Sequence, residues 1–165
     1  MILYPDAYLK NVKEITLDFL NKNNIKGLIL DIDNTLIDYD KKLLDGVKEW
    51  CENLKSRNIK LCMVSNTNKI KKVEKVAKVL GLEYICFSNK PFKQAFYNGQ
   101  KLLKLETNQI AVVGDQIFTD VLGGNRVGMF TILTQPIDER DIIITRIKRP
   151  FEKIVMKSYL KQRRK

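Results

Sequence analysis

Five short apolar runs alternate with longer amphipathic stretches along the chain. Several of the runs are rich in Ile and Val, and they end in glycine or polar residues. They cover residues 27–32, 59–64, 84–87, 109–113 and 129–133. Runs of this kind are typical of strands that are buried on both faces, as in a parallel sheet.

The stretches between the runs carry apolar residues at helical spacing. This spacing predicts helices over residues 43–54, 70–80, 92–103 and 119–126. Gly81 supplies the expected stop of the second helix, because glycine readily adopts the left-handed conformation that ends helices. Two further packed helices are expected near the chain ends, over residues 12–20 and 150–160.

Alternating strands and helices predict an α/β fold in which helices cover both faces of a parallel sheet. We therefore expect a three-layer α/β/α, Rossmann-like domain with a central five-stranded parallel sheet. A single domain is expected over residues 1–165, with its core at about 25–135 and a basic helix at about 150–162. The short gaps from Asp33 to Ser65 and from Ser65 to Lys90 leave no room for a large cap domain.

Polar residues follow four of the predicted strands, where ligands bind in open parallel sheets. Asp31 and Asp33 follow the first strand, Ser65 the second, Lys90 the third, and Asp115 the fourth, with Asp120 five residues later. Clustered carboxylates repel one another unless a cation lies between them, and oxygen ligands favour Mg²⁺ where phosphate is present. Such a site can bind a phosphoryl group, attack it with one carboxylate and move protons with a second.

The ordered motifs DIDNT, SNT, Lys-Pro and GDQIFTD resemble the four motifs of the haloacid dehalogenase (HAD) superfamily, over residues 28 to about 133. The stretch GDQIFTDVLGGNRVG, with PD near the start and IKRP later, resembles the YqeG branch of the capless class IIIA phosphatases. That branch is similar to mitochondrial phosphatidylglycerophosphate phosphatases. The resemblance implies an HAD-like fold and a Mg²⁺-dependent phosphomonoester hydrolase that forms an aspartyl-phosphate.

The resemblance also assigns catalytic and metal-binding roles. Asp31 would be the nucleophile and a magnesium ligand. Asp33 would be the general acid/base and would give its backbone carbonyl to the metal. Asp115 would complete the Mg²⁺ site with support from Asp120, although Asp120 is also explained as a charge near a helix N-terminus.

The implied phosphate-binding set is Ser65, Asn66, Lys90 and Thr35. Ser65 and Lys90 would contact the phosphoryl group, Asn66 would donate its N–H, and Thr35 would help to fix the catalytic loop. Ser65 is equally suited to capping the helix that follows it.

The net charge of +11 favours anionic partners, and residues 146–165 carry nine basic residues against Glu152. This tail is expected to pack on the domain, with binding to an anionic membrane as the alternative.

The physiological substrate stays open between phosphatidylglycerophosphate, a sugar phosphate, a nucleotide and a phosphoprotein. A nucleic-acid- or ribosome-binding protein on an HAD scaffold, or a phosphotransferase, would explain the same features. Nucleic acid is not expected, although it is not excluded, because the basic stretches lack the interleaved aromatic residues typical of RNA readers.

The absence of histidine excludes Ser-His-Asp triads, histidine phosphatases and HExxH metal sites. Cys51 and Arg57 match the Cys-x5-Arg pattern of cysteine phosphatases, but Cys51 is expected in mid-helix as a packing residue.

No apolar run approaches the length of about 20 residues that spans a bilayer. The N-terminus lacks a signal-peptide pattern, so a cytoplasmic location is expected, with peripheral association at the inner membrane face as a possible extension.

Overall fold

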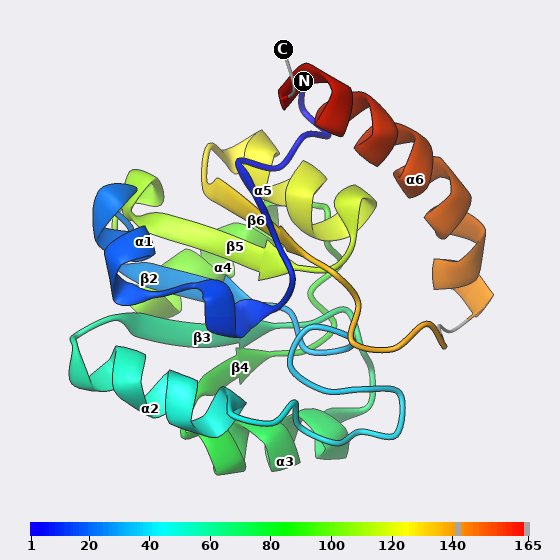
Figure 1. Cartoon of the computed structure of the whole chain (residues 1–165). Helices are drawn as coiled ribbons and strands as arrows, with labels where there is room; N and C mark the ends of the chain where they lie inside the picture. Colours follow the sequence, from blue (N-terminus) through cyan, green and yellow to red (C-terminus); the bar gives the residue numbers. More distant parts are fainter. Residues whose placement is uncertain (141–142, 164–165) are drawn as a thin grey trace.

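A computed structural model, which describes residues 1–140 and 143–163, contains a six-stranded sheet whose paired strands are all parallel (Figure 1). The strand order is β1-β6-β5-β2-β3-β4. The strands are β1 (Ala7–Leu9), β2 (Gly27–Leu30), β3 (Lys60–Val64), β4 (Glu83–Ile85), β5 (Ile110–Gly114) and β6 (Phe130–Thr134).

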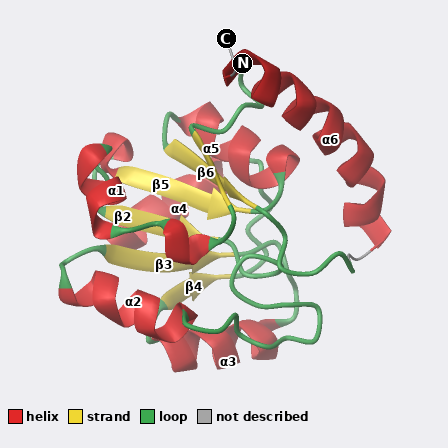
Figure 2. Ribbon diagram, in the orientation of Figure 1, coloured by secondary structure: helices red, strands yellow, loops and turns green. Residues whose placement is uncertain are grey.

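Helices flank the sheet on both sides (Figure 2). The α-helices are α1 (Leu17–Lys22), α2 (Val47–Ser56), α3 (Ile70–Leu80), α4 (Lys93–Leu103), α5 (Leu122–Val127) and α6 (Ile143–Arg163). Two 3-10 helices, η1 (Val12–Glu14) and η2 (Thr107–Gln109), and a π-helix, η3 (Ile117–Val121), complete the described elements.

The three layers follow from the alternation of side chains along each strand. Leu28 and Leu30 of β2 join one buried cluster, which includes apolar residues of α2 and α3. Ile29, between them, joins a second cluster on the other face, with Phe96 of α4. Each central strand is therefore covered on both faces, which confirms the predicted α/β/α architecture.

All five predicted strands are present, but the predicted strand number is wrong by one. The additional strand, β1, lies at the sheet edge and pairs with β6 in the register Ala7↔Ile132. Asp6 and Lys10 border its three residues, so no longer apolar run marks this strand in the sequence.

The helix predicted over residues 12–20 is wrong as a single element. The chain forms η1, leaves helical conformation at Ile15, and starts again as α1 after Thr16. The Thr16 side chain accepts a hydrogen bond from the Phe19 N–H at 3.2 Å, so it caps α1 and fixes the new start. The helix α3 ends as predicted, with Gly81 in the left-handed conformation at φ 63°.

The C-terminal helix α6 begins earlier than predicted and runs along the outside of the molecule (Figure 1). Its last turns lie beside the N-terminal segment, where the Tyr4 hydroxyl lies 2.6 Å from Ser158 Oγ. The Tyr4 and Tyr159 rings pack edge to face with centroids 5.6 Å apart. Within the described residues, no helix combines the length and the apolar character needed to cross a membrane.

Candidate active site

The carboxyl ends of the central strands β5, β2 and β3 lie at the same edge of the sheet. The chain continues from β2 toward β3 and β4 but from β5 toward β6, in the opposite direction across the sheet. Ligands bind at such a point in open parallel sheets. A cavity of about 830 Å³ opens there. Of the predicted site residues, Asp31, Asp33, Ser65, Asn66 and Lys90 line this cavity. Between Asp33 and β3 the described chain forms only a loop and the helix α2. Within the loop, Ile37 makes isolated β-bridges to Asp33 and Leu43. The site is therefore capless, as predicted.

Asp31 and Asp33 lie on a tight loop directly after β2. The Asp31 N–H continues the sheet by donating to the Val113 carbonyl at 2.8 Å. Ile32 is fully buried, and its carbonyl accepts the N–H of Leu36 at 2.9 Å. Because the side chain of Ile32 points into the core, the two flanking carboxyl groups reach the same cavity.

Lys90 is a buried ammonium that holds two carboxyl groups. Its Nζ donates to Asp31 Oδ1 and to Asp120 Oδ1, both at 2.7 Å. Burial lowers the pKa of Lys90, but the carboxylates of Asp120 and Asp31 outweigh that effect and leave the pKa above its usual value. Lys90 therefore stays charged within the site.

Burial raises the pKa of the Asp31 carboxyl to about 7, which Lys90 opposes and Asp120 and Asp33 reinforce. Burial likewise raises the pKa of Asp115 well above its usual value, although Arg149 acts in the opposite direction. These carboxyl groups are buried close together, and additional positive charge would favour their ionised forms.

Ser65 and Asn66 order the loops after β3 and β4. Ser65 is buried, and its Oγ accepts the Thr67 N–H at 3.2 Å, whereas α3 starts later, at Ile70, without a side-chain cap. The side chain of Asn66 donates to the Lys90 carbonyl at 3.0 Å and accepts the Lys90 N–H at 2.6 Å. Asn66 thus holds the main chain of Lys90 in place.

Asp115 directly follows β5, and Asp120 lies within η3. Asp120 is 1% exposed, and its Oδ2 accepts the Gln116 N–H at 3.3 Å. A Cβ atom at Gly114 would overlap the carboxyl group of Asp120, so a glycine is required for this close approach.

Carboxylate oxygens of Asp31, Asp115 and Asp120 lie within 4.8 Å of one another, so these residues are able to hold a divalent metal ion. Asp115 Oδ1 is buried and has no hydrogen-bond partner among the described residues. Because a buried carboxylate oxygen without a donor is costly, this oxygen fits a metal ligand. An all-oxygen set of this kind suits a hard cation such as Mg²⁺.

Thr35 is 1% exposed and is not among the residues that line the cavity, and its Oγ1 has no partner among the described residues. Cys51 lies within α2, and burial raises the pKa of its thiol to about 12. A thiol with so high a pKa is a poor nucleophile, which supports the interpretation of Cys51 as a packing residue.

Sequence reasoning missed three charged residues at the site. Lys72 of α3 donates to both carboxylate oxygens of Asp33, at 2.6 and 2.8 Å, and no sequence signal distinguishes it from the other lysines of that helix. Arg149 of α6 donates to the Asp115 carboxylate, and Glu152 binds the start of η3. Both lie in the basic tail, in which Glu152 is the one acidic residue.

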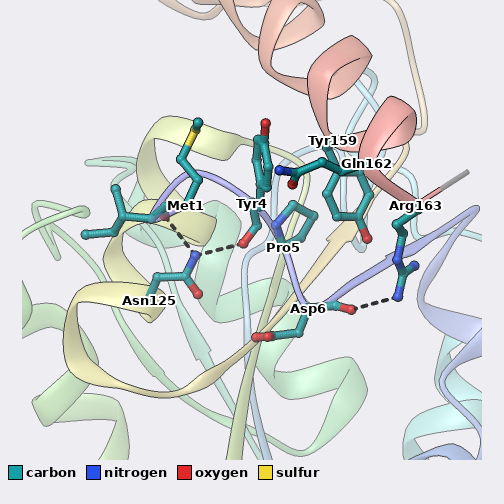
Figure 3. Close-up of a pocket in the computed structure, with 9 residues that line it drawn as sticks. Met1, Tyr4, Pro5, Asp6, Asn125, Tyr159, Gln162 and Arg163 are labelled. Carbon is teal, nitrogen blue, oxygen red and sulfur yellow. Dashed lines mark hydrogen bonds between the residues drawn. The ribbon is translucent and has the colours of Figure 1, made fainter. Parts of the chain in front are cut away.

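A second hollow, of about 730 Å³, lies between the N-terminal segment and the last turns of α6 (Figure 3). Asn125 donates there to the carbonyls of Ile2 and Tyr4, and Arg163 to the carbonyl of Asp6. None of its lining residues belongs to the carboxylate site. These contacts instead help to hold the two ends of the chain together.

Comparisons with known proteins found similar phosphatases. The model of the family described as Mitochondrial PGP phosphatase matches residues 1–138. A probable phosphatase YqeG of Bacillus subtilis is 39% identical over 153 residues, which cover 92% of this chain and 88% of that protein. Phosphatidylglycerophosphate phosphatase 1, chloroplastic/mitochondrial, of Arabidopsis thaliana is 24% identical over 169 residues, which cover 96% of this chain and 48% of that protein.

Solved structures share the fold. The crystal structure of a possible sugar phosphatase of the HAD superfamily from Cytophaga hutchinsonii superposes with a TM-score of 0.54 at 15% identity, over 86% of this chain and 94% of that chain. The chain therefore belongs to the mitochondrial PGP phosphatase family and is an HAD-type phosphatase, a phosphoric monoester hydrolase of the YqeG branch.

Proposed function

We propose that this phosphatase is Mg²⁺-dependent and hydrolyses phosphomonoesters through an aspartyl-phosphate on Asp31. The observation that carries the proposal is the buried cluster of Asp31, Asp115 and Asp120 beside the Lys90 ammonium. In the proposed site, Asp31, Asp115, the backbone carbonyl of Asp33 and, in support, Asp120 hold the metal. When bound, Mg²⁺ would neutralise charge on the phosphoryl oxygens and polarise the phosphorus atom.

The proposed chemistry uses two carboxyl groups in turn. Lys90 holds Asp31 Oδ1, so Oδ2 is the oxygen that attacks phosphorus, and the bond between phosphorus and the leaving oxygen breaks. Asp33, released from Lys72 and protonated by solvent, gives its proton to that oxygen. Asp33 then takes a proton from water, whose oxygen attacks the phosphorus of the aspartyl-phosphate and releases inorganic phosphate and free Asp31.

Proposed phosphate contacts come from the loops around the cavity. An ammonium has three N–H donors, and Lys90 uses two of them on Asp31 and Asp120, which leaves one for a phosphoryl oxygen. Ser65 lines the same cavity and is the proposed hydroxyl donor. Asn66 is proposed to donate its N–H, and Thr35 to stabilise the catalytic loop.

Phosphatidylglycerophosphate is the proposed substrate. The relative from Arabidopsis thaliana that bears this activity in its name supports it. The open cavity also has Lys69 in its lining, whereas Lys72 is paired with Asp33 and Arg140 with Asp40. An exposed cation such as Lys69 suits a substrate that carries a phosphodiester beside its terminal phosphomonoester.

The test is phosphate release in Mg²⁺ from short-chain phosphatidylglycerophosphate, a sugar phosphate, a nucleotide and a phosphopeptide. We expect the lipid to have the highest kcat/KM, and Asp31→Asn to lower it by on the order of 10³-fold or more. Asp45→Asn, an exposed carboxyl group outside the cavity, is the matched control. Equal activity of wild type and Asp31→Asn would exclude the mechanism, and preference for another phosphate ester would exclude the substrate.

We also propose that the outer face of α6 associates with an anionic lipid surface. Ile147, Phe151 and Ile154 are 65, 60 and 66% exposed and follow helical spacing. Exposed basic residues flank them, including Lys153 and Lys157. An exposed apolar stripe bordered by cations is typical of helices that lie in a membrane interface.

Co-sedimentation with vesicles tests this association. Phe151→Asp with Ile154→Asp is expected to abolish binding to vesicles that contain phosphatidylglycerol, and to leave turnover of a soluble phosphomonoester unchanged. Val79→Asp, at an exposed apolar residue of α3, is the matched control and should bind as wild type does. Equal binding of the double variant would exclude α6 as the contact surface.

A further inference from the structure

Two charged residues of α6 contact Asp115 and the start of η3, the element that carries Asp120. They are Arg149, which is 18% exposed in its side chain, and Glu152, which is 5% exposed. Both are 34 or more residues from Asp115 in sequence and lie beyond the residues 1–138 that match the family model. Neither belongs to the set of residues that the motifs assign to catalysis.

Glu152 caps the π-helix η3. Its Oε1 accepts the N–H of Ile117 at 2.7 Å and that of Phe118 at 3.4 Å. The first N–H groups of a helix lack intrahelical acceptors, and Gln116, at the N-cap of η3, makes no side-chain capping bond. A carboxylate from another helix therefore fixes the start of the element that carries Asp120.

Arg149 holds Asp115, which precedes η3 in the chain. Its Nη1 donates to the Asp115 carbonyl at 2.8 Å and to Glu152 Oε2 at 3.0 Å, and its Nη2 donates to Asp115 Oδ2. The planar guanidinium thus binds the main chain and the side chain of Asp115 at the same time. The compact ammonium of a lysine would be less suited to both contacts. Asp115 Oδ1 is left buried and, among the described residues, without a donor.

From these contacts we infer that Arg149 and Glu152 are positioning residues that set Asp115 for metal binding. One carboxylate oxygen is held by Arg149, and the start of η3 is held by Glu152. Groups that hold metal ligands in this way commonly change metal affinity when they are substituted. The inference rests on the proposed function to the extent that this metal site is the one used in catalysis.

Packing of α6 is separable from this role. Val155 and Met156 pack against the buried cluster of Ile117, Val121 and Leu133, and the Tyr159 ring packs against Tyr4. These contacts do not involve Arg149 or Glu152, so a substitution at either one leaves the docking surface in place. A merely structural role of the two charges would therefore change stability without changing metal affinity.

The experiment measures Mg²⁺ binding by calorimetry and by the Mg²⁺ dependence of thermal unfolding, with wild type, Arg149→Gln, Arg149→Lys and Arg146→Gln. We expect Arg149→Gln to weaken Mg²⁺ affinity by roughly 10–100-fold and Arg149→Lys to give an intermediate loss. Arg146 is an exposed arginine on the same helix, and its variant should bind Mg²⁺ as wild type does. An unchanged or stronger Mg²⁺ affinity in Arg149→Gln would overturn the inference, even if that variant unfolds at a lower temperature.

Glu152→Gln gives an independent test if Arg149→Gln does not fold. It keeps an oxygen that accepts the Ile117 N–H but removes the charge that faces Arg149, so a smaller loss of Mg²⁺ affinity is expected, and an unchanged affinity counts against the inference. Phosphatase assays separate the two proposals. Failure of wild type to release phosphate would refute the proposed function, whereas the Mg²⁺ titration would still decide the role of Arg149.

Discussion

At the scale of single residues, Lys90 shows how one buried cation organises acidic groups from distant parts of the sequence. It lies 59 residues from Asp31 and 30 residues from Asp120, yet it contacts both. Its side chain is 3% exposed, so the interactions are screened little by solvent. The site therefore depends on Lys90 for electrostatic balance as well as for its proposed contact with phosphate.

Replacement of Lys90 by methionine is expected to destabilise the metal-free protein by about 3–5 kcal/mol, because it leaves buried carboxyl groups without their partner. Chemical unfolding in the presence of a chelator measures the change. Lys101→Met, at an exposed position of α4, should change the free energy of unfolding by less than about 0.5 kcal/mol. Similar losses in both variants would show that the Lys90 contacts do not stabilise the fold.

The thiols give a second prediction at this scale. Burial raises the pKa of Cys51 and of Cys62 to about 12, so at mildly alkaline pH both remain thiols rather than reactive thiolates. Cys86 is less buried. A chromogenic disulfide reagent should therefore label Cys86 in the native protein and all three cysteines after unfolding, and rapid native labelling of three thiols would contradict the packing.

At the scale of elements, the sequence predicted five of the six strands because buried parallel strands give nearly continuous apolar runs. The same runs predicted the site, since a residue that follows such a strand lies at the sheet edge where ligands bind. The edge strand β1 and the break at Ile15 escaped prediction because each depends on local pairing or capping rather than on periodicity. Lys72 and Arg149 escaped because their partners are fixed by tertiary packing.

The turn after β5 gives the prediction for this scale. Gly114→Ala would force Cβ into the carboxyl group of Asp120, so we expect a loss of about 1–3 kcal/mol in stability together with weaker Mg²⁺ binding. Gly128→Ala is the control, because its Cβ would meet open space although its φ of 76° disfavours a side chain. That variant should lose stability while binding Mg²⁺ normally, and equal Mg²⁺ affinities in the two variants would refute the role of the close approach.

At the scale of the whole molecule, the acidic cluster makes folding and metal binding interdependent. β2 and β5 bring Asp31 and Asp115 to adjacent positions, and α6 reaches back to the same place from the far end of the chain. Folding must bury these carboxyl groups, at a cost that appears as the raised pKa values of Asp31 and Asp115. A cation that binds the folded state and not the unfolded chain offsets part of that cost.

Mg²⁺ is therefore expected to stabilise the fold, by about 2.7 kcal/mol at a concentration 100 times its Kd. Thermal unfolding with increasing Mg²⁺ measures the effect, and a chelator should reverse it. Asp115→Asn keeps the shape of the side chain but removes the charge that faces the proposed cation, so this variant should lose most of the Mg²⁺-dependent increase in Tm while the metal-free protein stays folded. Asp45→Asn should keep the full increase. If Mg²⁺ shifts the Tm of wild type and Asp115→Asn equally, the cation binds elsewhere and the cluster of Asp31, Asp115 and Asp120 is not its site.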